Sequence, residues 1–562
     1  MNIFRRRQWL ALFRALQMRD RILVLFFVTL VVGALVFWLG AIYVASTKVV
    51  PQFGGEYTEG IVSQPRYINP ILSQTSEADA DISELVYSGL FSYDAEGKLV
   101  KRLLEDYQIS EDGKVYTLTL KQGVKWHDGE ELDAEDVLFT IRAIQDPAYK
   151  SPLRTNWLSV EAVSVDRFTV ELTLKKAYSG FLESLTVGIL PKHIWENIAP
   201  ENFFLADYNL APVGSGPYRF YDSEKDSNGN MISYELRAFE GYFASMPNIA
   251  KIVFHFYPDE PTLLDAFNRR EVLGMNSVTP ASLPLLQERR SARVYEISIP
   301  RIFAVFFNIT KSPALAHDEV RSALSFATDR EAIIRDVLSG KGQVAETALL
   351  PFMNGYASDV AFSRYDENQA NTILDQNNWQ RGEDGIRGKN GTVLEFDLQV
   401  PDWPELVRTA EMLREQWSRV GVRVKVVSLS AADLQQNVIR PREYEALLFG
   451  EAAMIDSDLY SFWHSSQKHD PGLNLAVFDN KNIDDTLVAL RETIDVETRK
   501  ELYRSFQDIL AQENPALFLY SPTYLYVVNS AVKGVEVKNI NAPAHRLSMV
   551  KDWYIETKRV KK

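Results

Sequence analysis

The chain alternates between segments whose apolar residues repeat every second position and segments in which they repeat every three to four positions. The run VYTLTL at 115–120 shows the first pattern and predicts a strand. The run AEDVLFTIRAI from residue 134 has apolar residues at i, i+3, i+4 and i+7, which predicts a helix. Strand and helix patterns alternate in this way along most of the chain, which indicates an α/β organisation.

The second half of the chain repeats this alternation with clear start and stop signals. Residues 319–340 predict two successive helices, the second capped by Asp329 and ended by Gly340. Residues 404–420 predict a further helix, which Gly421 ends. The residues after it, 422–426, alternate valine with basic residues and predict a strand.

Length and composition limit the kind of protein. A chain of 562 residues with 46% apolar residues is too long for one compact core and sufficient for two or three. A net charge of -14 and a pI near 5.2 argue against a nucleic-acid-binding surface, because phosphates are neutralised by clustered lysine and arginine. The chain has no cysteine, which excludes disulfides, thiolate nucleophiles, sulfur-ligated metals and a lipid-modified cysteine.

The first residues predict a membrane segment. Residues 1–21 contain six arginines and one aspartate, a local charge of +5, so the rest of the chain carries -19. The 25 residues Ile22–Ser46 that follow carry no charge, which is long enough to span a bilayer. The basic side is expected to stay in the cytoplasm and the remainder to lie outside. The alternative is a long cleaved signal peptide, although no small-x-small site stands out after Tyr43.

The most conspicuous candidate for chemistry is QGVKWHDGEELDAEDV at 122–137, which contains one histidine and six acidic residues. A structural interpretation accounts for these acids. Asp133 is placed to cap the predicted helix, Glu135 and Asp136 lie at the positive end of its dipole, and Glu130 and Glu131 are expected to be solvated. The alternative is a catalytic or metal-binding cluster.

No standard catalytic or metal-binding motif is present. The sequence lacks GxSxG, HExxH, GxxxxGK[ST] and GxGxxG. His464 and His469 are five residues apart, which does not place two imidazoles on one helical face. Ser215 in GSGPY is flanked by glycine and proline, and a rigid turn explains it better than a nucleophile. We therefore predict a protein that is not an enzyme and has no catalytic residue, metal or cofactor.

Several segments together resemble the family 5 extracellular solute-binding proteins, the oligopeptide, dipeptide and nickel binding subunits of ABC importers. The resemblance extends from about Gly55 to Val528. It is carried by NP at 69–70, LVYSGLFSYDAEGKL at 85–99, SEDGKVYTLTLKQGVKWHDGEELDAEDVLFTI at 110–141, APVGSGPYRF at 211–220 and VFFNITKSPALAHDEVRSALSFATDREAII at 305–334. The third segment is close to the most diagnostic pattern of that family.

The resemblance implies a bilobal, hinged α/β fold like that of periplasmic binding proteins, with an extra subdomain. Its implied divisions are 51–82, 214–304 and 521–562 as a discontinuous first lobe, 83–213 as the extra subdomain, and 305–520 as the second lobe. The charge and the apolar run described above place a cytoplasmic basic segment at 1–21 and a transmembrane signal anchor at 22–46 before them.

The resemblance also implies a function and its partners. The protein is expected to capture an oligopeptide or similar small solute between its lobes, outside the cytoplasm, and to deliver it to ABC permease and ATPase subunits. Relatives that bind peptides pair with the main chain of an extended ligand, so side-chain specificity is weak. We expect a single-pass, membrane-anchored monomer.

One segment departs from the family pattern. Peptide-binding relatives carry a G-W-x-x-D segment in the second lobe, whose aspartate pairs with the α-amino group of the peptide. The matching segment here, 449–465, reads FGEAAMIDSDLYSFWHS, with Glu451 in place of the tryptophan and Met454 in place of the aspartate. Glu451, Asp456 or Asp458 is the candidate for the amino-binding role. The alternative is that these acids are solvated and that the ligand has no free amine.

Further ligand-binding candidates are Gln74, Thr75 and Ser76, which follow the NP segment, and the aromatic residues Trp403, Phe449 and Trp463. For each tryptophan, core packing is an equally good explanation. Two rival functions remain at this point. One is a receptor or scaffold that keeps the fold without import; the other is a surface hydrolase that uses the acidic cluster.

Overall fold

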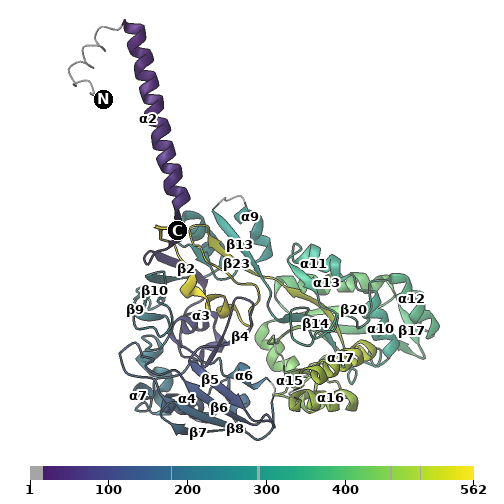
Figure 1. The fold of residues 1–562 in the computed structure, drawn as a ribbon. Coiled ribbons are helices and arrows are strands. Elements are labelled where there is room, and N and C mark those ends of the chain that lie inside the picture. The colour runs from purple at the N-terminus through teal and green to yellow at the C-terminus, as the bar shows by residue number, and fades with distance from the viewer. Residues whose placement is uncertain (1–16, 179, 288–290, 456–457, 494) are drawn as a thin grey trace.

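The computed structural model describes residues 17–178, 180–287, 291–455, 458–493 and 495–562. The arginines at positions 5, 6, 7 and 14 lie outside the described residues. One long helix, α2 (Met18–Ser46), projects from a body made of two lobes (Figure 1). No residue of α2 is buried, and its apolar composition is that of a helix able to cross a membrane.

The first lobe is built on a mixed seven-stranded sheet whose strands come from distant parts of the chain. Its order is β13-β23-β12-β2-β11-β10-β9. Strand β2 is parallel to both β11 and β12, whereas the other pairs are antiparallel. The bounds are β2 (Glu56–Val62), β9 (Tyr218–Lys225), β10 (Met231–Ala238), β11 (Lys251–Tyr257), β12 (Gly274–Met275), β13 (Ala292–Ile297) and β23 (Tyr524–Asn529). Helices α8 (Glu260–Arg269) and α9 (Leu283–Gln287) supply apolar residues to a core with β12 and β23.

An antiparallel four-stranded sheet forms the extra subdomain. Its order is β5-β6-β8-β7, with β5 (Leu104–Ile109), β6 (Val115–Leu120), β7 (Val160–Asp166) and β8 (Thr169–Leu174). The subdomain also contains β3 (Phe91–Tyr93), β4 (Leu99–Lys101), α4 (Ala134–Gln145), α5 (Arg154–Trp157), α6 (Phe181–Ser184) and α7 (Lys192–Trp195). Its buried residues belong to the same apolar cluster as those of the first lobe, so the two parts share one core. Strand β6 and helix α4 confirm the two patterns predicted for residues 115–145.

The second lobe has a six-stranded sheet with helices on both faces. The order is β15-β22-β14-β21-β19-β20. The strand bounds are β14 (Arg301–Phe307), β15 (Gly342–Val344), β19 (Glu395–Pro401), β20 (Arg423–Leu429), β21 (Ala446–Ala452) and β22 (Ala516–Pro522). A small three-stranded sheet, β16 (Gln380–Arg381), β17 (Arg387–Lys389) and β18 (Thr392–Val393), lies beside it.

Alternate residues of β14 supply two separate cores. Val305 and Phe307 pack with α10 (Asp318–Phe326), α11 (Arg330–Val337), α12 (Glu367–Gln376) and α13 (Pro404–Arg419). Ile302, Ala304 and Phe306 pack with α15 (Tyr460–Trp463), α16 (Lys481–Glu492) and α17 (Val496–Glu513), and with the π-helical turn at Leu434–Ile439 that follows α14 (Ala431–Asp433). The predicted pair of helices after residue 318 is confirmed, and the side chain of Asp329 accepts from the Ala332 N–H as expected of a cap. The helix and strand predicted at 404–426 are confirmed as α13 and β20.

The chain passes between the two large sheets twice. Residues 298–300 join β13 of the first lobe to β14 of the second, and Thr523 joins β22 back to β23. Two short crossings of this kind are the arrangement in which lobes move relative to each other as rigid bodies. The lobe boundaries given above remain predictions.

The acidic cluster at 122–137 is structural. Asp133 accepts from the Glu135 N–H, and Asp136 accepts from the Asp133 N–H, so the two acids form a capping box at the start of α4. The expectation that Glu131 is solvated was wrong: it accepts from the Gly123 N–H at 3.1 Å and pairs with Arg167 at 2.8 Å. These contacts join Glu131 to the turn at Gly123 and to the connection between β7 and β8, where Arg167 lies.

The GSGPY segment is a close approach of two backbones. A Cβ atom on Gly214 would lie 1.9 Å from the carbonyl oxygen of Val86, and one on Gly216 would lie 2.4 Å from that of Leu85. Both carbonyls belong to the end of α3 (Glu77–Val86). Only glycine fits at these two positions, which explains the motif without a catalytic role.

A buried ionic cluster joins three distant segments of the first lobe. The guanidinium of Arg546 donates to Asp81 of α3 at 2.7 and 2.6 Å and to Glu59 of β2 at 2.8 Å, and all three side chains are 0% exposed. The hydroxyls of Tyr57 and Tyr526 donate to Glu59. These hydrogen bonds compensate for the desolvation of the charges and fix the turn at Pro543–Leu547 against α3.

Replacing Arg546 with methionine is expected to lower the free energy of unfolding by about 3 to 5 kcal/mol, because two carboxylates are left buried without their cation. The measurement is a urea titration followed by tryptophan fluorescence. Arg504→Met is the matched control, since Arg504 pairs with Asp359 at the surface and is 50% exposed; its cost should not exceed about 1 kcal/mol. Equal costs for the two variants would contradict this account of the cluster.

Candidate functional site

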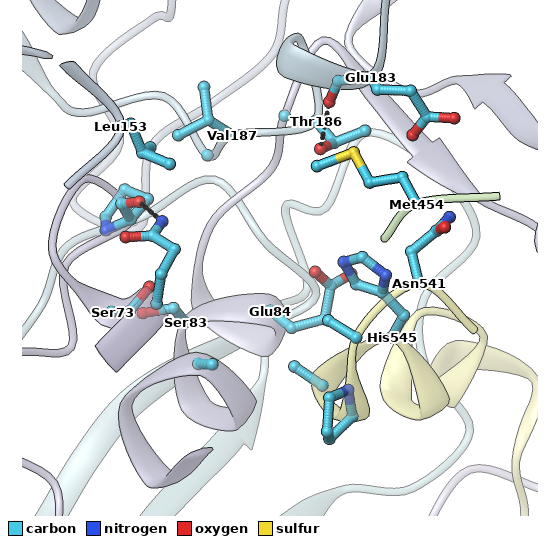
Figure 2. A pocket seen from close by; sticks show the side chains of 18 of the residues that line it. Ser73, Ser83, Glu84, Leu153, Glu183, Thr186, Val187, Met454, Asn541 and His545 are labelled. Carbon is cyan, nitrogen blue, oxygen red and sulfur yellow. Dashed lines mark hydrogen bonds between the residues drawn. The ribbon is translucent and has the colours of Figure 1, made fainter. Parts of the chain in front are cut away.

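A cavity of about 550 Å³ lies between the lobes (Figure 2). The first lobe lines it with residues 73–77 and 541–545, and the extra subdomain with residues 183–184 and 186–188. The second lobe contributes Arg301 and residues 452–454. In Figure 2, Met454 enters from the second lobe and lies between Thr186 and Asn541. The volume is within the range of about 300 to 1,000 Å³ that is usual for small-molecule sites.

The predicted first-lobe candidates Gln74, Thr75 and Ser76 all line this cavity. The amide of Gln74 donates to the carbonyl of Pro70 at 2.6 Å, and the hydroxyl of Ser76 caps α3 by accepting from the Asp79 N–H at 3.4 Å. The preceding Asn69 is fully buried and bonds to Ile71 and Asn209, which fixes the turn that leads into this wall. Their role in ligand binding stays a prediction.

Charged groups line the cavity unevenly. Glu84 pairs with Arg102 at 3.1 Å, and Glu183 accepts from the hydroxyl of Tyr93. Burial raises the pKa of both Glu77 and Glu84. Among the described residues, the guanidinium of Arg301 has no ion-pair or hydrogen-bond partner. Arg301 is therefore the cation of this cavity that is available to a ligand.

His545 also lines the cavity, and burial lowers its pKa to about 4. Its imidazole is therefore neutral at physiological pH, with one ring nitrogen a donor and the other an acceptor, and its buried Nδ1 has no hydrogen-bond partner among the described residues. Sequence reasoning missed both His545 and Arg301. No motif surrounds either residue, and only the fold brings them to the cleft.

A second, smaller cavity of about 150 Å³ adjoins the first, with Ala452 lining both. Glu451 lines the second cavity and is only 7% exposed. Its Oε1 atom has no hydrogen-bond partner among the described residues. Burial raises the pKa of this carboxyl group to about 8. A buried carboxyl without a partner is costly to the folded protein, and a bound cation would remove that cost.

The other two acidic candidates are placed differently. Asp456 lies outside the described residues. Asp458 pairs with Arg491, whose Nε lies 2.9 Å from Oδ1, and it also accepts from Ser461 at 3.2 Å. Asp458 lines neither of the two cavities. Its carboxylate instead joins α15 to α16 through Ser461 and Arg491.

The aromatic candidates divide into two kinds. Trp403 is 43% exposed and is stacked on Phe449, with ring centroids 6.3 Å apart, and Phe449 lines the second cavity. Trp463 is 1% exposed and packs against Phe306, Phe506 and Phe518. For Trp463 the structure therefore shows core packing, the alternative given above.

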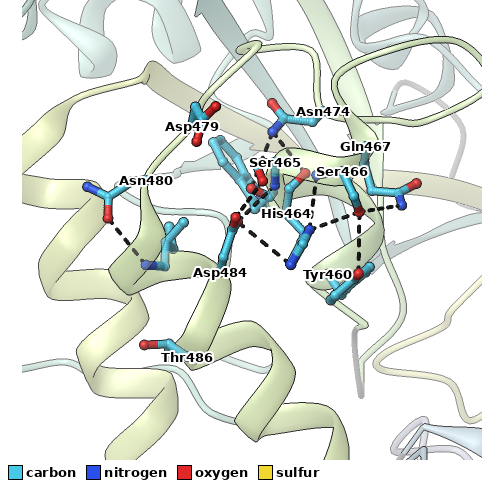
Figure 3. Close-up of polar contacts among 12 residues, drawn as sticks. Tyr460, His464, Ser465, Ser466, Gln467, Asn474, Asp479, Asn480, Asp484 and Thr486 are labelled. Carbon is cyan, nitrogen blue, oxygen red and sulfur yellow. Dashed lines mark hydrogen bonds and ion pairs between the residues drawn. The ribbon is translucent and has the colours of Figure 1, made fainter. Parts of the chain in front are cut away.

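A serine, a histidine and an aspartate meet beside α16 in an arrangement that superficially resembles a catalytic triad (Figure 3). The Nδ1 of His464 lies 2.9 Å from the hydroxyl of Ser466 and also accepts from the Ser466 N–H at 3.0 Å. Its Nε2 is 3.9 Å from Asp484, both of whose oxygens accept from Ser465. The aspartate does not orient the imidazole, and neither cavity described above reaches the serine. This is a capping network for the short helices around it.

Comparison with known proteins agrees with this architecture. The profile of the family described as bacterial extracellular solute-binding proteins, family 5 Middle, matches residues 98–471. The dipeptide-binding protein of Escherichia coli K12 is 28% identical over 502 residues, which cover 84% of this chain and 90% of that protein. The structure of NikZ from Campylobacter jejuni in complex with Ni(L-His) is 26% identical, with a TM-score of 0.73, and the match covers 89% of this chain and 99% of NikZ.

The structure of the oligopeptide-binding protein AppA from Bacillus subtilis in complex with a nonapeptide is 25% identical to this chain, with a TM-score of 0.72. The match covers 90% of this chain and 100% of AppA. These likenesses confirm the predicted α/β fold of the periplasmic-binding-protein type. The chain belongs to the family 5 bacterial extracellular solute-binding proteins.

Proposed function

We propose that this protein is a membrane-anchored, extracytoplasmic substrate-binding protein of an ABC importer, which captures a peptide or peptide-like solute and delivers it to the permease. The observation that carries the proposal is the cavity between the lobes, which both lobes and the subdomain line. The relatives named above include a dipeptide-binding and an oligopeptide-binding protein, which supports a ligand of this class.

Capture follows from the two crossings at 298–300 and 523. A ligand in the cavity touches Arg301 and residues 452–454 on one side and residues 73–77 and 541–545 on the other. It gains contacts with both lobes only when they are closed on it, so binding shifts the population towards the closed form. The permease would recognise that closed form, and no covalent step is required.

Helix α2 supports the anchoring part of the proposal. Its 29 residues lie outside the body with none of them buried, and its mean hydropathy over the apolar window is 2.9. A helix of this composition is stable only when a bilayer or another apolar surface covers it. We propose that it stays attached and holds the body at the outer membrane face.

Two charged residues suggest how a zwitterionic ligand is bound. Arg301 lines the larger cavity and Glu451 the smaller one that adjoins it. Arg301 is in register with Ala452 and Glu451 with Ile302, so the two side chains leave opposite faces of the sheet at neighbouring positions, and a ligand would have to reach both cavities to contact them. We propose that Arg301 binds a carboxylate of the ligand and that Glu451 binds its ammonium group. Each would be a charge-assisted contact with the ligand.

The proposal predicts what the protein carries. Native mass spectrometry of the full chain, purified in mild detergent from its own host, is expected to show a trapped solute with a free amino group and a mass in the range of a small peptide. An amine-free sugar, or a consistently empty cleft, would contradict it.

Glu451 predicts an unusual pH dependence of stability. Its carboxyl group ionises near its ordinary pKa of 4.5 in the unfolded chain but near 8 in the empty folded protein. Below about pH 4.5 the group is protonated in both states, and its contribution to stability is complete. As the pH rises to about 8 the group stays protonated only in the folded protein, so the free energy of unfolding falls by up to about 1.4 kcal/mol per pH unit. Urea titrations between pH 5 and 8 are expected to show this slope, and Glu451→Gln should flatten it. The exposed Glu497→Gln is the matched control and should leave it unchanged.

The amino-binding role of Glu451 predicts a difference between matched peptides. Tri-alanine is expected to bind about tenfold or more tightly than N-acetyl-tri-alanine, because a hydrogen bond to a charged group contributes about 1.5 to 3 kcal/mol. In Glu451→Gln the two peptides should bind alike, as measured by isothermal titration calorimetry. If acetylation weakens binding equally in both proteins, another group binds the amine.

A further inference from the structure

The end of the membrane helix is joined to the last strand of the chain. Helix α2 ends at Ser46, and β1 (Thr47–Pro51) begins at the next residue without a linker. Strand β1 pairs antiparallel with β24 (Thr557–Lys561), with Thr47 opposite Lys561. The N–H of Lys562 donates to the backbone carbonyl of Ser46 at 3.0 Å. The hydroxyl of Thr47 donates to the backbone carbonyl of Tyr43 at 2.6 Å. The two-stranded ribbon is thus held directly at the helix end (Figure 1).

This ribbon is basic although the protein as a whole is acidic. Its basic residues are Lys48, Lys558, Arg559, Lys561 and Lys562, and Glu556 is the nearby acid in the sequence. Among the described residues, none of these five basic side chains forms an ion pair with a carboxylate. Lys500, by contrast, is exposed and pairs with Glu497. Five unpaired cations at one place make a site for an anionic partner.

The length of the apolar segment places this ribbon at the lipid headgroups. The uncharged run Ile22–Ser46 is 25 residues, which corresponds to about 37 Å of helix, whereas the hydrocarbon core is about 30 Å thick. The last turn of α2 therefore lies in the headgroup layer. Tyr43 in that turn is the kind of aromatic residue found at this depth, and the guanidinium of Arg559 lies 5.8 Å from its ring centroid. Lys48 is two residues after Ser46, Lys561 lies opposite Thr47, and the N–H of Lys562 bonds to Ser46, so all three lie at the membrane end of the ribbon.

Exposed apolar residues accompany the charges. Val49 of β1 is 55% exposed, and Phe53 just after it is 51% exposed. An aromatic and an aliphatic side chain beside lysine and arginine form the usual composition of a surface that rests in the membrane interface.

We propose that the ribbon of β1 and β24 is a binding site for anionic phospholipid headgroups on the outer face of the membrane. The inference rests on the proposed anchoring by α2. Binding of headgroups by the ribbon would hold the first lobe against the bilayer, while the acidic remainder of the body is repelled from the same surface. The protein then has a preferred orientation on the membrane in addition to an anchor.

The test uses the full chain in an uncharged detergent. Phosphatidylglycerol or phosphatidylcholine is titrated in, and bound lipids are counted by native mass spectrometry. The ribbon variant carries Lys558→Gln, Arg559→Gln, Lys561→Gln and Lys562→Gln. The matched control removes the same number and kinds of exposed charges from the second lobe, with Arg335→Gln, Lys425→Gln, Lys481→Gln and Lys500→Gln.

The wild-type chain and the control are expected to prefer phosphatidylglycerol, and the ribbon variant to bind it about tenfold or more weakly, since four of the cations that attract the anionic headgroups are removed. The arginines of residues 1–21 are present in all three proteins, so they cannot produce this difference. Unchanged phosphatidylglycerol binding by the ribbon variant, or equal binding of both lipids by the wild type, would overturn the proposal.

Two further measurements separate this proposal from the proposed function. Circular dichroism and thermal unfolding of the ribbon variant should match those of the wild type, and the solute trapped in the cleft should still be retained. Extraction of host membranes with alkaline carbonate tests the anchor itself. Loss of anchoring would contradict the proposed function, whereas an anchored protein with no lipid preference would contradict only the lipid site.

Discussion

The buried contact between Arg546 and the carboxylates of Asp81 and Glu59 is the constraint on which the first lobe depends. It joins a turn near the end of the chain to α3 and to the central strand β2, over more than 450 residues of sequence. Residues 541–545, which lead into that turn, and residues 73–77, which lead into α3, form facing parts of the same cleft wall. The ionic cluster therefore sets the shape of the wall that a ligand meets, since a rigid turn on one side is fixed to a rigid helix on the other.

The second lobe supplies the groups that this wall lacks. Arg301 begins β14 and Glu451 lies near the end of β21, two central strands of the second-lobe sheet. Arg301 forms no ion pair or side-chain hydrogen bond among the described residues, and the Oε1 atom of Glu451 has no hydrogen-bond partner there. Burying Glu451 without a partner is costly, so the proposed ammonium group of a ligand would gain affinity by removing that cost. This is a case in which a locally unfavourable residue points to function more clearly than a favourable one.

The sequence predicted most of the regular elements because their signals are local. Helix α11 and its cap at Asp329, the capping box that begins at Asp133, and the strand at 115–120 depend on residues within a few positions of one another.

The site was predicted less completely. Gln74 to Ser76 and Glu451 were found because family motifs pointed to them. Arg301 and His545 were missed because only long-range pairing brings them to the cleft. Asp458 was a plausible candidate from the sequence, but its carboxylate forms an ion pair with Arg491, which lies 33 residues later. Partners that are distant in sequence are what local patterns leave out.

The direct passage of α2 into β1 has a mechanical consequence. Both the helix and the last strand adjoin the first lobe (Figure 1). With α2 anchored as proposed, the first lobe would be the fixed part and the second lobe the part that moves. Under the proposed anchoring by α2, the protein would diffuse in two dimensions at a set height above the bilayer. Encounters with the proposed permease would then depend on lateral diffusion and rotation about one axis, and a high effective concentration would be obtained without a flexible tether.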